Sequence, residues 1–160
     1  MRRPALLLLA LLLPACSGHR AEGLPPPPPA DVSHIVRPAT PNTALAAPSG
    51  FSPAPDIVTR RYAVPASILY ATIKKVALAE PRTYLQIAYD DRMQADYVAR
   101  SRVFNFPDLI TVQVRPDATL ILWSRSVYGR SDFGVNRARL TAWLKALDTA
   151  LARNASGGST

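Results

Sequence analysis

The chain contains very few of the side chains that most catalytic and metal sites use. Among its 160 residues there is one cysteine, Cys16, and there are two histidines, His19 and His34. A lone cysteine cannot form an intramolecular disulfide, and all three residues precede the segment that we expect to fold. The expected domain therefore lacks the usual zinc ligands and the histidine base of Ser-His or Cys-His catalysis.

Long apolar runs are also missing. The run at residues 5–13 is nine residues long, whereas a helix needs about 20 to cross a bilayer. Because Arg2 and Arg3 precede it, the run has the form of a secretory signal peptide. It is followed by Leu13-Pro14-Ala15-Cys16, which resembles the lipobox of bacterial lipoproteins. The resemblance implies that residues 1–15 are removed and that Cys16 carries fatty acyl chains. The alternative is an unmodified cysteine in an ordinary signal peptide.

The resemblance places the protein in the bacterial envelope, anchored by lipid and facing the periplasm. Ser17 follows the cysteine, and the absence of aspartate there favours the outer membrane over the inner one. The formal net charge of +8 favours acidic partners. Nucleic acid is the least favoured of these, because the leader exports the chain.

Proline is concentrated near the N-terminus. The chain has 16 prolines, and ten of them fall between Pro25 and Pro55, five in succession. Such runs adopt polyproline II and cannot bury enough apolar surface to fold. We therefore expect residues 16–55 to be a lipid-anchored, proline-rich disordered linker. Recognition of the prolines by a partner is the alternative.

Hydrophobic periodicity predicts one domain at residues 56–153, followed by a disordered tail at residues 154–160. Apolar residues alternate where strands are expected and recur at helical spacing in two segments. The order is β-α-β-β-β-β-α. Its simplest solution is an α+β fold of two layers, with an antiparallel sheet and both helices on one face. The expected strands are residues 56–63, 83–89, 93–103, 110–114 and 119–127, and the expected helices are residues 65–80 and 137–151.

Polar residues and glycines gather between the last strand and the last helix. A helix N-terminus favours anions, and arginine can bind a carboxylate or a phosphate through two hydrogen bonds. We therefore interpret this stretch as a candidate anion-binding site. The alternative is purely architectural: Asp132 or Ser131 caps the helix, Gly129 supplies a positive φ, and Asn136 points inward. Arg102 and Asp108, from the preceding part of the expected sheet, are added to the residues of this stretch. The candidate residues are Arg102, Asp108, Ser124, Arg125, Ser126, Gly129, Arg130, Ser131, Asp132, Gly134 and Asn136.

Two blocks of sequence, residues 101–108 and 124–140, resemble the bacterial family of domains of unknown function numbered 1499. The resemblance extends over residues 56–151. The chain departs from the family pattern at Leu109, where a second aspartate is common, and at Val127, where many members have arginine. The resemblance implies a compact envelope domain, and the family has no established activity, cofactor or substrate.

These observations favour a non-enzymatic domain that binds an anionic small molecule, a lipid headgroup or an envelope polymer. We expect no cofactor, metal site or catalytic residue. The alternative is a protein-interaction module of an envelope complex that uses a sheet face bearing Trp123 and Arg125. A carboxylate-based enzyme is less favoured, because most of the candidate carboxylates lie at expected turns; they are Asp90, Asp91, Asp96, Asp108 and Asp132.

Overall fold

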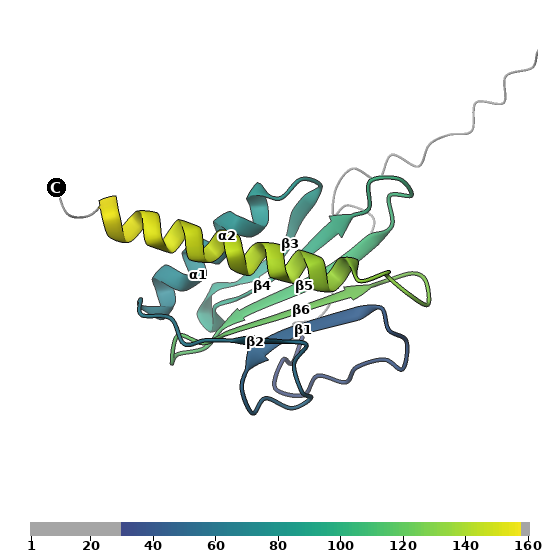
Figure 1. Cartoon of the computed structure of the whole chain (residues 1–160), viewed down its shortest axis with the longest axis horizontal. Helices are drawn as coiled ribbons and strands as arrows, with labels where there is room; N and C mark the ends of the chain where they lie inside the picture. The colour runs from purple at the N-terminus through teal and green to yellow at the C-terminus, as the bar shows by residue number, and fades with distance from the viewer. Residues whose placement is uncertain (1–29, 158–160) are drawn as a thin grey trace, which may run out of the picture.

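Six strands and two helices make up residues 30–157, the part of the chain that the computed structural model describes (Figure 1). The expected signal peptide, Cys16 and the five consecutive prolines lie outside the described residues. The elements are β1 (Thr43–Pro48), β2 (Ile57–Thr59), α1 (Ala66–Ala79), β3 (Thr83–Tyr89), the short 3-10 helix η1 (Asp90–Arg92), β4 (Gln94–Arg100), β5 (Pro107–Val114), β6 (Leu120–Ser126) and α2 (Val135–Gly157).

The strands form one mixed sheet in the order β2-β1-β6-β5-β4-β3. Strands β3 to β6 form an antiparallel meander. Strand β1 pairs antiparallel with β6 and parallel with β2. Both helices lie across one face of the sheet (Figure 1), so the predicted α+β fold with two helices on one face is confirmed. The sheet has one strand more than predicted and contains one parallel pair.

The core between the helices and the sheet is built from the apolar positions that face each other. Trp143 of α2 is fully buried and meets the Tyr97 ring edge-on, with ring centroids 5.9 Å apart. Ile73 of α1 and Leu140 of α2 are also fully buried in this cluster. These positions recur at helical spacing in the sequence, which is why the two helices could be predicted.

The prediction of a disordered linker up to residue 55 is wrong at β1. Ala44 and Ala46 face the helices, whereas Leu45 and Ala47 pack on the other face with Val32 and Ile121. All four β1 residues are buried. A strand that is buried on both faces shows no apolar–polar alternation, and alanine is a poor strand former. β1 is held in an extended conformation because β2 pairs with one of its edges and β6 pairs with the other.

The predicted tail at residues 154–160 is also wrong over its first part, because α2 continues to Gly157. Residues 158–160 lie outside the described part of the chain. Alanine is the best helix former, and Ala150, Ala152 and Ala155 supply it here. The Ser156 hydroxyl donates to the Ala152 carbonyl within the helix at 3.0 Å. The alanines near the terminus therefore support the helix beyond the point where fraying was expected.

No helix among residues 30–157 is long and apolar enough to cross a membrane.

Candidate functional site

A buried polar network joins β5, β6 and the first turns of α2. Arg139 donates from Nη2 to Asp108 Oδ2 at 2.7 Å. Its Nη1 donates to Ser124 Oγ at 2.9 Å and to Asn136 Oδ1 at 2.7 Å. The Arg139 and Asp108 side chains are only 14% and 10% exposed. A buried charge must be paired and hydrogen-bonded. The two charged members of this network, Arg139 and Asp108, meet that condition through each other.

Asn136 extends the network to the N-terminal part of the domain. Its Nδ2 donates to the Asn42 carbonyl and to Ser126 Oγ, both at 3.0 Å. The Asn42 side chain in turn donates to the Gly129 carbonyl at 2.8 Å. Asn136 therefore points inward, as the architectural alternative predicted. Its main-chain partner is the carbonyl of Asn42, just before β1.

Asp132 caps α2, which was also part of the architectural alternative. Its Oδ1 accepts the Gly134 N–H at 3.0 Å and its Oδ2 accepts the Asn136 N–H at 2.8 Å. Ser131 Oγ accepts the Phe133 N–H at 3.3 Å. Gly129 has φ +89°, a conformation that glycine adopts without strain. The helix N-terminus is thus already satisfied by a carboxylate, which an incoming anion would have to displace.

The structure separates the predicted arginines. Arg125 lies on the sheet face opposite the helices, where its guanidinium stacks 4.1 Å from the Trp123 ring centroid. Arg102 lies in the turn after β4, beyond the strand in which it was predicted, and is exposed. Arg130 is exposed in the β6–α2 loop. These three side chains therefore do not converge on the start of α2.

A second polar cluster surrounds Arg125. Its Nη1 donates to Thr111 Oγ1 at 3.3 Å, and Thr111 Oγ1 donates to Asp96 Oδ1 at 2.6 Å. Burial raises the pKa of Asp96, against the opposing effects of the Thr111 hydrogen bond and the Arg125 charge. Burial likewise lowers the pKa of Arg125. Since Val32, Ile35 and Phe51 pack near Ile121 and Trp123, part of this face is covered.

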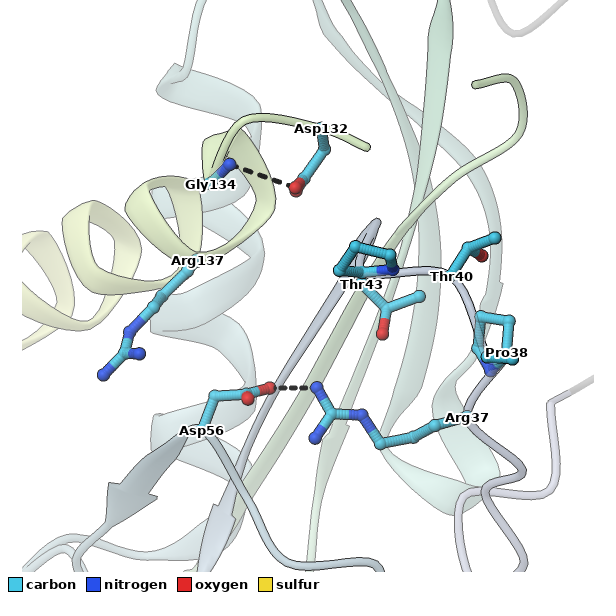
Figure 2. A pocket seen from close by; sticks show the side chains of 10 residues that line it. Arg37, Pro38, Thr40, Thr43, Asp56, Asp132, Gly134 and Arg137 are labelled. Carbon is cyan, nitrogen blue, oxygen red and sulfur yellow. Dashed lines mark hydrogen bonds and ion pairs between the residues drawn. The ribbon is translucent and has the colours of Figure 1, made fainter. Parts of the chain in front are cut away.

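An open pocket of about 390 Å³ lies beside the start of α2 (Figure 2). The lining residues come from the segment before β1 and its first residue, from Asp56, from the loop that leads into α2 and from the first turn of α2; they are Arg37, Pro38, Ala39, Thr40, Pro41, Thr43, Asp56, Asp132, Gly134 and Arg137. Arg37 Nη2 donates to Asp56 Oδ2 at 2.5 Å. Asp56 Oδ2 also accepts the Leu45 N–H at 2.8 Å, so this ion pair is tied to β1.

Four of the candidate carboxylates have partners of their own. Asp90 pairs with Lys74 at 2.8 Å, while Asp96, Asp108 and Asp132 have the separate partners described above. Within residues 30–157, no three histidine, cysteine, aspartate or glutamate side chains gather to hold a metal ion.

A serine, a histidine and an aspartate do meet in the turn that precedes β1. Ser33 Oγ and Asp31 Oδ2 both lie 2.9 Å from His34 Nδ1. Because both contacts use the same ring nitrogen, the imidazole cannot relay a proton from the serine to the aspartate. All three side chains are exposed, and hydrogen bonds from Ser33 and His34 lower the pKa of Asp31 to about 2.

Several residues at these sites were not predicted. Arg139 appeared only within the family-like block, although its spacing from Asn136 indicated the same helical face. Three of the others precede the expected domain, Asp56 is its first residue, and Arg137 is the first residue of the expected last helix; they are Arg37, Thr40, Asn42, Asp56 and Arg137.

The fold and these contacts define a small α+β domain in which most polar residues at the start of α2 support the architecture. The sequence profile of a family described as "Protein of unknown function (DUF1499)" matches residues 35–147, so the chain belongs to this family. The match begins before β1, in agreement with the place of that strand in the sheet. No curated protein and no solved structure matches the chain.

Proposed function

We propose that this domain is a non-enzymatic binding module for an anionic group, and that the pocket beside the start of α2 holds that group. The anion would belong to a small molecule, a lipid headgroup or an envelope polymer. The observation that carries the proposal is the position of Arg137. Its guanidinium extends from α2 on the side where the Arg37–Asp56 pair lies (Figure 2), and within residues 30–157 no carboxylate pairs with it.

The charges of the pocket support an anion. Asp56 is compensated by Arg37, and Asp132 is engaged by two N–H groups of α2. Within residues 30–157, Arg137 is therefore the arginine of the pocket lining that no ion pair engages. Arg37 keeps donors that the Asp56 contact does not use, because a guanidinium has five N–H groups. The Thr43 hydroxyl adds a neutral donor at the pocket wall. Two guanidinium groups and a hydroxyl suit a carboxylate or a phosphate.

Replacing Arg137 by alanine should abolish most of this binding without unfolding the domain, since the side chain is exposed. Loss of one charge-assisted contact costs about 1.5–3 kcal/mol, or roughly 10- to 150-fold in affinity. The measurement is native mass spectrometry of the full chain released from membranes in mild detergent. A mass that is lost on denaturation should be present in the wild-type protein and depleted in Arg137→Ala.

The matched control is Arg92→Ala, which removes an exposed arginine that does not line this pocket. It should retain the bound mass. Equal retention by Arg137→Ala would remove the pocket from consideration. A wild-type protein free of any bound mass, which also fails to bind inorganic phosphate or acetate in calorimetry, would favour the protein-interaction module instead.

We also propose that the chain is an envelope lipoprotein that is anchored through Cys16, and that the anchor lies in the outer membrane rather than the inner one. The lipobox-like sequence before Cys16 supports this. Cells fed with radiolabelled palmitate should label the wild-type protein, and Cys16→Ser should abolish the label and release the protein from membranes, because the Cys16 sulfur is the atom to which the diacylglycerol would be attached. Ser17→Ala is the control and should stay labelled. An unlabelled wild-type protein would contradict the anchor.

A further inference from the structure

Two loops lie at the same end of the sheet (Figure 1), and exposed aromatic rings from the two loops meet there. The first loop, residues 101–106, joins β4 to β5, and the second, residues 127–134, joins β6 to α2. Phe104 stacks on Phe106 with ring centroids 5.5 Å apart, and Phe106 lies 5.9 Å from Tyr128. The Val127 N–H, at the start of the second loop, donates to the carbonyl of Pro107, which directly follows the first loop, at 3.2 Å. We call these two loops the aromatic tip.

The apolar side chains of the aromatic tip are unusually exposed. Phe133 is 95% exposed, Val103 77%, Phe104 71% and Tyr128 57%. Single exposed apolar residues are common, but a group of them on one surface marks an interaction site. Packing within residues 30–157 does not explain the position of Phe133, whose ring is almost entirely in solvent.

Hydrogen bonds hold the backbone of both loops while the rings remain outside. In the first loop, Arg100 Nη1 donates to the Asn105 carbonyl at 3.2 Å, and the Phe106 N–H donates to Ser101 Oγ at 2.9 Å. In the second loop, Phe133 has φ +53°, a left-handed conformation that is costly for an aromatic residue. The adjacent cap of α2 fixes it there. The fold therefore presents these rings in a defined geometry.

The charge of the aromatic tip is positive. Arg102 and Arg130 are exposed, one in each loop, and within residues 30–157 no carboxylate pairs with either. Asp132, the one acidic residue of the two loops, is engaged by the N–H groups of α2. Outward aromatic rings flanked by free arginines are the features of surfaces that enter an anionic membrane interface.

We propose that the aromatic tip docks the domain on an anionic lipid bilayer, with its rings in the headgroup region and Arg102 and Arg130 on lipid phosphates. Phenylalanine rings gain from leaving water, and tyrosine suits the boundary between headgroups and acyl chains. Charge complementarity and the outward projection of Phe133 favour a lipid surface over a protein groove. This docking is independent of the pocket, since Arg37 and Arg137 take no part in it.

The test is co-sedimentation of the full chain carrying Cys16→Ser, which removes the proposed lipid anchor, with phosphatidylglycerol-rich vesicles. Phe104→Ser/Phe133→Ser should reduce the partition coefficient about 100-fold, because two rings would no longer leave water. Arg102→Ala/Arg130→Ala should reduce it about tenfold or more. The arginine pair should matter little on neutral phosphatidylcholine vesicles, and added salt should weaken binding to the anionic ones.

Matched controls remove exposed residues elsewhere. Val58→Ser/Leu78→Ser replaces two apolar side chains of 64% and 52% exposure on β2 and α1. Arg92→Ala/Arg153→Ala replaces two exposed arginines outside the aromatic tip. Both controls should bind vesicles as the Cys16→Ser protein does, and so should Arg137→Ala. Unchanged vesicle binding by Arg137→Ala would show that membrane docking does not need the pocket. The docking proposal and the pocket proposal can therefore fail independently.

Phe133→Trp checks insertion directly and keeps a ring at this position if the serine variant folds poorly. The additional indole fluorescence should shift to the blue with anionic vesicles and be quenched by lipids brominated on the acyl chain. The proposal is overturned if the Cys16→Ser protein does not bind phosphatidylglycerol vesicles, if the tip variants bind as well as the controls, or if vesicles leave the fluorescence of the Phe133→Trp variant unchanged.

Discussion

Replacing Asp108 by alanine should lower the free energy of unfolding by about 3–5 kcal/mol, the usual cost of removing one partner of a buried ion pair. The variant leaves the Arg139 guanidinium, 14% exposed, without its carboxylate. Arg139 would keep its bonds to Ser124 and Asn136, but neither of them carries a compensating charge. Urea denaturation followed by circular dichroism measures the change. Asp117→Ala, at the exposed turn before β6, is the matched control; it gives up bonds to Thr119 but strands no buried charge.

The double variant Asp108→Leu/Arg139→Met separates the stranded charge from the loss of the pair. Apolar residues often replace a buried ion pair at little cost, so the double variant should be more stable than Asp108→Ala. It should still be less stable than the wild-type protein, because Ser124 and Asn136 lose a donor. A loss below about 1 kcal/mol for Asp108→Ala would contradict the buried network.

Replacing Leu45 by alanine should cost about 2–5 kcal/mol, as for other large-to-small changes in a well-packed core. Leu45 is fully buried, in a cluster that contains Val32, Ile35 and Ile121. The same denaturation experiment measures the change. Because Leu45 belongs to β1, the result also decides whether this strand is part of the folded domain.

Val36→Ala is the control for Leu45→Ala, because Val36 is 82% exposed in the segment just before β1. It should change the free energy of unfolding by less than about 0.5 kcal/mol. If Leu45→Ala were equally mild, residues 43–48 would not be held in the sheet. Removal of residues up to 48 would then leave a stable domain, whereas we expect that truncation to unfold it.

Local patterns accounted for most of the fold. The apolar stripe that includes Leu140 and Trp143 predicted α2 in the correct place, and the helix expected at residues 65–80 agrees with α1 to within one residue at each end. The alternation from Thr83 to Tyr89 predicted β3 with the correct bounds. These elements each bury one face, so their periodicity is visible in the sequence. Strand β1 is buried on two faces and is rich in alanine, and it therefore left no such signal.

The site was less accessible to sequence reasoning, because its contacts connect residues that are far apart. The caps and turns were predictable, since Asp132 and Gly129 act on their immediate neighbours. The bond between Asn42 and Gly129 spans 87 positions, and the Arg139–Asp108 pair spans 31. Arg125 was interpreted as part of the site at the start of α2 and, in the alternative, as part of a sheet face with Trp123. Alternation along β6 places its side chain with Trp123, on the opposite face from Ser124. Only the pairing of the strands fixes these positions.

The register between β1 and β6 also has a consequence for the order in which the chain can fold. Ala44 pairs with Ser124, so these partners are separated by about 80 residues. A chain that is synthesised from its N-terminus exposes β1 long before β6 is available. The β3–β6 meander needs only neighbouring segments, and short-range contacts of that kind close quickly. Strand β1 therefore joins the sheet after β6 has formed. Until β1 pairs with β6, the hydrogen-bonding edge of β1 is open to other chains.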